Sequence, residues 1–202
     1  MNVTALQKAL TAAGYACTAD GALGPNTYAA LLSYASGRQL GAIGPQLGAG
    51  MVAAFAPSGI VSDLEVAHWI AQAAHETEGF RYLTELGGSS YFAKYDGRKD
   101  LGNTHPGDGF TYRGRGIFQI TGRWNYAHYG AELGLDLEGN PNLAAQPDIA
   151  VKTACKFWVD NHIGPPADAD DLEAVTRKVN GGLNGLADRQ DMLTRVKRIM
   201  GI

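Results

Sequence analysis

Apolar residues recur at helical spacing in the first part of the chain. A pattern over residues 3–13 predicts a helix that stops at Gly14. A second pattern over 28–35 predicts a helix with Asn26 as its N-cap. Residues 36–50 contain five glycines and a proline, and we expect them to form a linker or an irregular third segment.

Helical patterns return after residue 50. Ser62 and Glu65 fit an S-x-x-E capping box, and the helix that follows is expected to end near Gly79. Nine glycines and one proline interrupt residues 80–122, which favours loops with room for one short hairpin. Three further helices are predicted to begin at Pro147, near Asp170 and near Leu186. Because strand signals are few, the pattern predicts a mainly α fold.

Composition limits the class of protein. Of 202 residues, 45% are hydrophobic and 18% are charged, which is enough apolar material for a core. The net charge of −3 argues against a nucleic-acid partner, and no apolar stretch reaches the length of a membrane span. The charge changes from +1 over the first 60 residues to −4 over the rest. We therefore predict two units, 1–44 and 45–202.

Cysteine and histidine usage argues against disulfides and metals. Cys17 and Cys155 lie 138 positions apart, and we expect two free thiols in a reducing compartment. The pair His75-Glu76 does not extend to H-E-x-x-H, because position 79 is glycine. His68 lies two helical turns from His75, about 10.5 Å, which is too far for one ion. We expect no metal and no cofactor.

Two glutamates form a candidate catalytic pair. On one continuous helix, Glu76 and Glu85 would be rotated about 900° apart and face opposite ways. Gly79 lets the chain turn back, so that the two carboxylates can face each other across a cleft. Glu76 would lie near the negative end of its helix dipole, which suits a carboxyl that must carry a proton. Glu85, in an exposed loop, would stay ionised, and such a split is typical of glycoside hydrolysis.

The surrounding residues suit a sugar-binding cleft. Six of the nine tyrosines fall between residues 82 and 129, and aromatic faces stack on sugar rings. Gly114 and Gly116 permit close backbone approach or unusual backbone angles. If the following segment is extended, Gln119 and Thr121 point to the same side.

Several motifs resemble one enzyme family. HETEGF, DGRKDLGNTHPGDGFTYRGRGIFQITGRWNY and VNGGLNGLADR, in this order, are similar to the family 19 glycoside hydrolases, most of all the phage endolysins, with chitinases as relatives. The resemblance implies a two-lobed, lysozyme-like helical domain that acts by single displacement with inversion. An inverting pair needs room for water between its carboxyl groups, roughly 6.5–9.5 Å, so we predict a Glu76–Glu85 separation in or somewhat above this range.

The resemblance also implies roles for single residues. Glu76 matches the general acid, Glu85 the general base that activates water, and Thr121 a residue that helps to hold this water. Positions that bind or organise the substrate match Gln119, Asn125, Tyr126, Asn180 and Arg189.

The first unit is similar to the small helical peptidoglycan-binding modules of wall hydrolases, through the segment VTALQKALTAAGYACTADGALGPNTYAALLSYA. The alternative is a structural cap on the main domain. Together the resemblances imply a monomeric endolysin that cleaves β-1,4 bonds of peptidoglycan, with a chitinase or a non-catalytic wall-binding protein as alternatives. No ordinary secretion signal opens the sequence. We expect the protein in the host cytoplasm until membrane permeabilisation gives access to the periplasmic wall.

Overall fold

A computed structural model describes residues 1–202, and helices supply nearly all of its regular structure. The mainly α prediction is confirmed, whereas the glycine-rich stretch forms two single β-bridges, Thr84 to Arg115 and Arg115 to Ile120, in place of a hairpin. No helix combines the length and apolar character needed to cross a bilayer. The α-helices are α1 (Val3–Ala12), α2 (Pro25–Ser36), α3 (Ile43–Ala54), α4 (Asp63–Glu76), α5 (Ser89–Phe92), α6 (Asp108–Thr111), α7 (Arg123–Leu133), α8 (Pro147–Asp160), α9 (Gly164–Asp168), α10 (Leu172–Asn180) and α11 (Leu186–Met200).

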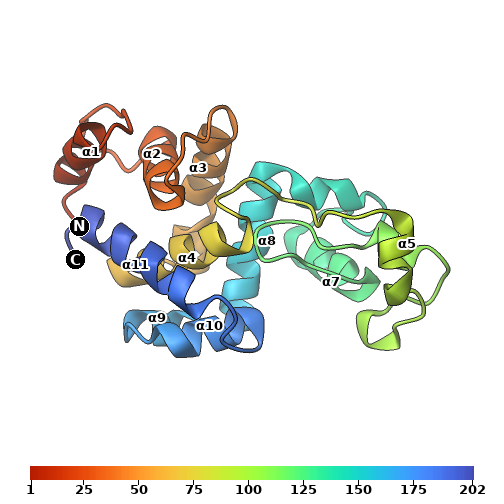
Figure 1. The fold of residues 1–202 in the computed structure, drawn as a ribbon. Helices are drawn as coiled ribbons and strands as arrows, with labels where there is room; N and C mark the ends of the chain where they lie inside the picture. The colour runs from red at the N-terminus through yellow and green to blue at the C-terminus, as the bar shows by residue number, and fades with distance from the viewer.

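The chain folds into two lobes (Figure 1). The larger one, called the helical body here, contains α1–α4 and α8–α11. The smaller one, called the small lobe, is formed by residues 80–145 with α5, α6 and α7. Helix α8 lies on the side of the body that adjoins the small lobe, and the two chain termini lie close together at the far end of the body.

One apolar core runs through the helical body. It extends from Leu6 and Leu10 of α1 through α4 to Val196 and Met200 of α11. The fully buried Trp69 of α4 packs edge-to-face on Phe55, with ring centroids 5.0 Å apart. The first 44 residues therefore share their core with the rest of the chain.

Two expectations for this first part are wrong in detail. Helix α2 begins at Pro25 with Gly24 as N-cap, so Asn26 lies inside the helix, where proline's fixed φ suits the first helical position. Residues 43–54 form the regular helix α3. Its glycines serve close packing, because a side chain on Gly48 would collide with the carbonyl of Pro25.

The predicted start of α4 is confirmed, but the Glu65 side chain does not complete the capping box. The Ser62 hydroxyl accepts a hydrogen bond from the Glu65 backbone N–H at 3.0 Å. The Glu65 carboxylate accepts instead from the indole N–H of Trp158 at 2.9 Å, which ties α4 to α8. Burial raises the pKa of Glu65.

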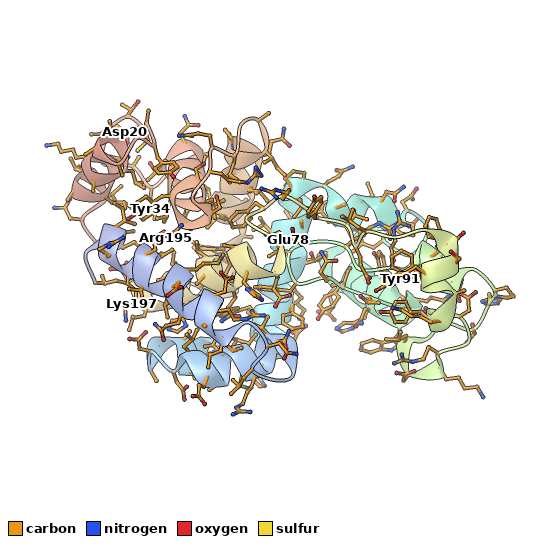
Figure 2. The ribbon with its side chains drawn as sticks, viewed as in Figure 1. Asp20, Tyr34, Glu78, Tyr91, Arg195 and Lys197 are labelled. Carbon is orange, nitrogen blue, oxygen red and sulfur yellow. The ribbon has the colours of Figure 1, made fainter.

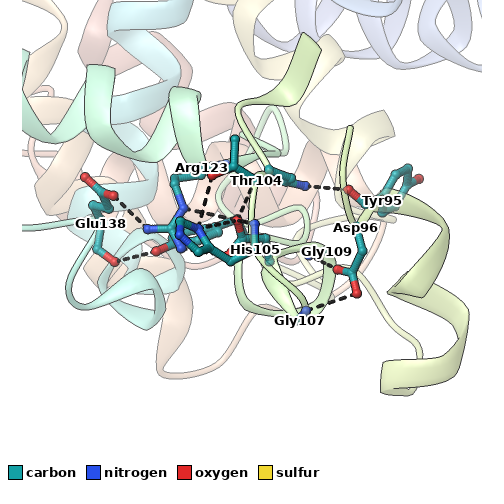
Figure 3. Close-up of polar contacts among 11 residues, drawn as sticks. Tyr95, Asp96, Thr104, His105, Gly107, Gly109, Arg123 and Glu138 are labelled. Carbon is teal, nitrogen blue, oxygen red and sulfur yellow. Dashed lines mark hydrogen bonds and ion pairs between the residues drawn. The ribbon is translucent and has the colours of Figure 1, made fainter. Parts of the chain in front are cut away.

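The small lobe is organised around a buried carboxylate (Figure 3). Asp108 accepts hydrogen bonds from the Arg123 guanidinium at 2.6 and 3.2 Å and from the backbone N–H groups of Thr104 and His105 at 2.9 and 3.0 Å. Arg123 also donates to Glu138 at 2.8 Å. Burial raises the pKa of Asp108, but these donors outweigh it, so the pKa lies below its usual value. Polar bonds thus hold loops that the sequence leaves without a helical pattern.

Candidate active site

The end of α4 borders a hollow of about 460 Å³ between the two lobes. Figure 2 labels one of its lining residues, Glu78, at the junction of the lobes. All three predicted catalytic residues, Glu76, Glu85 and Thr121, share its wall with the predicted substrate-binding residue Gln119. The lining residues are Glu76, Thr77, Glu78, Tyr82, Thr84, Glu85, Leu86, Tyr95, Gln119 and Thr121.

Helix α4 fixes the position of Glu76. Every residue from Glu65 to Ala74 is buried, so the helix is held on all sides by packing. Glu76 is its last residue, and its side chain keeps 20% of its surface exposed at the hollow. A buried helix thereby presents one carboxyl group to a solvent-filled space.

The turn after Glu76 reverses the chain through an unusual backbone path. Glu78, Gly79 and Phe80 have φ angles of 49°, 71° and 60°, in the left-handed region. The Thr77 hydroxyl donates to the carbonyl of Ala73 at 2.6 Å and accepts from the Phe80 N–H at 2.8 Å. The expected turn at Gly79 is present, and it directs the chain toward the opposite wall.

Two adjacent residues of α4 pair with two adjacent residues of α11. Arg189, fully buried, donates to the Glu76 carboxylate through Nη2. His75 contacts the Asp188 carboxylate with 2.6 Å between Nδ1 and Oδ2. The Glu76 ion pair lies at the edge of the hollow, so the carboxyl remains accessible.

Glu85 is held by the backbone of the opposite wall. Its N–H donates to the Gly114 carbonyl at 2.8 Å, and its Oε2 accepts from the Gly114 N–H at 3.1 Å. A Cβ on Gly114 would lie 2.6 Å from the Gln119 side-chain oxygen and 3.1 Å from Glu85 Oε2. The expected close approach at Gly114 is present, and at Gly116 the φ of 82° accounts for the second glycine.

Gln119 and Thr121 both reach the hollow without forming a strand. Gln119 has a φ of 51°, so the segment is a tight turn. Its side-chain amide donates to the carbonyl of Gly116 at 2.7 Å. The Thr121 hydroxyl donates to the Gln119 carbonyl at 2.9 Å, which leaves its oxygen free to accept a bond from water. The segment is therefore not extended, but both side chains still reach the same space.

Four of the five predicted substrate-binding residues do not line the hollow: Arg189, which reaches it only through Glu76, and Asn125, Tyr126 and Asn180. Asn125 donates to the Thr121 carbonyl at 2.7 Å and supports it from behind. Tyr126 is fully buried, and its hydroxyl donates to the Arg113 carbonyl and accepts from the Arg115 guanidinium. Burial raises its pKa to about 12. Asn180 is exposed at the end of α10.

The structure adds residues that the sequence reasoning missed. Glu78 brings a third carboxylate to the hollow, which has no lysine or arginine in its lining. Gln72, fully buried, accepts a hydrogen bond from Arg189 Nη1. A polar residue four positions before Glu76, in an otherwise apolar stretch of the helix, was the available signal. Across residues 1–202 no three carboxylate, imidazole or thiol groups gather closely enough to hold a metal ion.

Comparison with known sequences decides the family. Residues 47–177 match the sequence model of family 19, described as chitinase class I. The chain belongs to glycoside hydrolase family 19. It is 35% identical over 160 residues to a glycosyl hydrolase family 19 domain-containing protein of Haemophilus influenzae, covering 65% of this chain and 78% of that protein. An Arabidopsis thaliana endochitinase is 35% identical over 126 residues, 61% of this chain and 42% of the plant protein. The chain thus spans less than half the length of that plant relative.

Solved structures agree with this family 19 assignment. A mutant of chitinase C superposes with a TM-score of 0.66 at 26% identity, covering 85% of this chain and 75% of the other. The two-lobed, lysozyme-like helical fold predicted from the sequence is confirmed. The family match ends before α11 and begins after α2, so Arg189 and the first 46 residues lie outside the matched range.

Proposed function

We propose that this family 19 domain hydrolyses β-1,4 bonds between amino sugars with inversion, Glu76 acting as the acid and Glu85 as the base. The observation that supports this most is the hollow itself, where one carboxyl from the body faces the same space as one from the small lobe. Two carboxyl groups flanking one bond are what inverting hydrolysis requires.

The contacts of each glutamate suit its proposed role. The Glu85 carboxylate accepts a hydrogen bond from the Gly114 backbone N–H, which holds it in place at the hollow, as a general base requires. Glu76 becomes negative as it releases its proton to the leaving oxygen, and Arg189 lies in place to stabilise that developing charge. Thr121, with an oxygen free to accept, would orient water near Glu85.

Replacing either glutamate tests this mechanism. We expect Glu76→Gln and Glu85→Gln each to lower kcat by about 10²–10⁴-fold on a soluble N-acetylglucosamine hexamer, because proton transfer is lost. The exposed Glu173 of α10 supplies the control, since Glu173→Gln should keep full activity. Proton NMR of the first product should show the α-anomer. Full activity of Glu76→Gln, or a β-anomer as first product, would contradict the proposal.

We further propose peptidoglycan as the substrate, with the first unit as a wall tether. The chain has a groove of about 580 Å³ in this unit, and no residue lining it is charged. Hydroxyl and amide groups of Thr18, Asn26 and Gln39 and the ring of Tyr15 are among its walls. Such groups suit a neutral sugar segment, and tethering would raise the local concentration of the catalytic site.

The tether is tested by blocking the groove. Deleting residues 1–44 would remove part of the shared core and the bond from Arg38 to the carbonyl of Gly79 beside Glu76. A point variant avoids this damage. Asn26→Trp should lower retention on purified sacculi several-fold and leave hexamer hydrolysis unchanged. Gln46→Trp, on the exposed face of α3 outside the groove, is the matched control. Equal retention of both variants on sacculi would contradict the proposed tether.

Chitin is the second candidate, because endochitinase is the name of several relatives that match this chain. Products distinguish the two polymers. Mass spectrometry of digested sacculi should show released muropeptides, and the new reducing sugar identifies the bond. Activity on chitin oligomers with intact sacculi would favour chitin.

A further inference from the structure

A buried chain of hydrogen bonds leads from the core to Glu76. The Gln72 side-chain amide donates to the Thr176 hydroxyl of α10 at 3.3 Å, and its oxygen accepts from Arg189 Nη1. Arg189 in turn donates from Nη2 to Glu76. Gln72, Thr176 and Arg189 are all fully buried, so water does not compete for these bonds.

The acceptors of Arg189 differ in charge. Glu76 is its one anionic partner, whereas the Gln72 amide oxygen and the Asn184 carbonyl, 3.3 Å from Nε, are neutral. Arginine stays charged in proteins, so the buried cation must be satisfied in every protonation state of Glu76. When Glu76 carries its proton, the neutral acceptors are what still hold the guanidinium. A buried cation without acceptors is costly.

We propose that Gln72 is a positioning residue: it holds Arg189 through a neutral acceptor and thereby sets the pH range in which Glu76 can act as an acid. A neutral anchor fixes the guanidinium beside Glu76 without competing for its charge. The inference rests on the proposed role of Glu76 as the acid.

Other charged and titratable groups face Glu76 and form a constant background. Glu78 and Glu85 line the hollow with it, together with Tyr82 and Tyr95. His75 and Asp188 form the neighbouring pair between α4 and α11. Substitutions at Gln72 leave all of these in place, so a shift between variants reports the Arg189 contact.

Two substitutions should move the basic limb of the pH profile of kcat/KM in opposite directions. In Gln72→Glu, the introduced carboxyl group and Glu76 both contact Arg189. Because the two carboxyl groups are then close together and share one proton, the basic limb moves up by roughly one pH unit. In Gln72→Met, Arg189 depends more on Glu76 as an anion, and the limb moves to lower pH. In both variants kcat changes while KM stays within about twofold, because the contact acts on the proton donor.

Substitutions at two buried threonines, one bonded to Gln72 and one not, distinguish a positioning role from general destabilisation. Thr176→Val loosens Gln72 and should shift the limb in the direction of Gln72→Met. Thr153→Val removes an equally buried hydroxyl that bonds only within α8, so it should leave the limb in place. This pair decides the matter if Gln72→Met does not fold.

The outcomes are distinct for the two proposals. Opposite shifts in the two Gln72 variants, measured on the N-acetylglucosamine hexamer, support the positioning role. Folded variants with an unmoved limb overturn it, even if Glu76→Gln is inactive. An active Glu76→Gln overturns the mechanism itself.

Discussion

The helical body and the small lobe are held together by different forces. A cluster of 35 buried apolar residues fills the body and takes in only Phe80, Leu83 and Ile117 of the small lobe. The separate cluster of the small lobe has 7 residues, one of them Ile149 of α8. The lobe depends instead on the Asp108–Arg123 network and on backbone turns. Apolar packing is indifferent to direction, while hydrogen bonds demand particular geometry. The same chain therefore uses packing where it needs stability and directional bonds where it shapes a surface.

The proposed site combines apolar packing from the body with hydrogen bonding from the small lobe. Glu76 ends a helix fixed by packing, and Glu85 lies on a loop fixed by bonds to Gly114. Damage to the body should lower stability more than activity. Damage to the small lobe should do the reverse.

The largest stability effect is expected from a cavity in the body. Leu31 of α2 is fully buried in the large cluster, so Leu31→Ala should destabilise by about 3 kcal/mol. This corresponds to roughly 6–12 °C in Tm for a chain of this size. Thermal unfolding should show one transition, since residues 1–44 share the core. The exposed Val52 gives the control, because Val52→Ala should change little. A separate early transition would show that the first unit melts alone.

A smaller stability effect with a larger activity effect is expected from the small lobe. Asp108→Asn leaves Arg123 without its buried counter-ion and should cost about 2 kcal/mol. Hydrogen exchange should rise over residues 96–126 and stay slow in α4, and hexamer hydrolysis should fall more than in Leu31→Ala. Asp100→Asn, which breaks an exposed pair with Arg98, should be nearly neutral. Uniformly faster exchange in both lobes would contradict the division.

The smallest effect is a pH dependence confined to the body. Burial lowers the pKa of His68, although Asp170, 3.0 Å away, acts in the opposite direction. Below about pH 6.5 the unfolded chain binds a proton that the folded chain resists, so stability should fall as the pH falls. Urea unfolding at pH 5 and 7.5 should show this loss in wild type and a weaker one in His68→Gln. His162→Asn, at an exposed position, should behave as wild type. An unchanged pH dependence in His68→Gln would assign the loss to other groups.

The sequence predicted elements well where one face of a helix is apolar. Helices α1, α4, α8, α10 and α11 appear close to their expected bounds, because packing on one core imposes the 3.6-residue period. Helix α3 escaped prediction, since its glycines, which favour a loop locally, instead allow contact with α2. Helix α7 escaped too, because its own sequence is largely polar and its apolar side chains follow no clear stripe.

At the site, too, the sequence predicted some features and missed others. Glu76, Glu85, Gln119 and Thr121 could be selected from motif and spacing, and they share one hollow. Tyr126 matches a substrate-binding position by resemblance, yet its ring is fully buried. The Arg189–Gln72 contact joins residues 117 positions apart, a separation at which no local pattern reports proximity.

By itself, the sequence determined which amphipathic segments become helices and which residue types can do acid–base chemistry, because both depend on local spacing and on side-chain chemistry. Only the tertiary structure decided that α11 brings a buried arginine to the end of α4, and that Gly114 brings Glu85 to the facing wall. The physical reason is that long-range contacts arise from the packing of whole elements, which no short stretch of residues encodes.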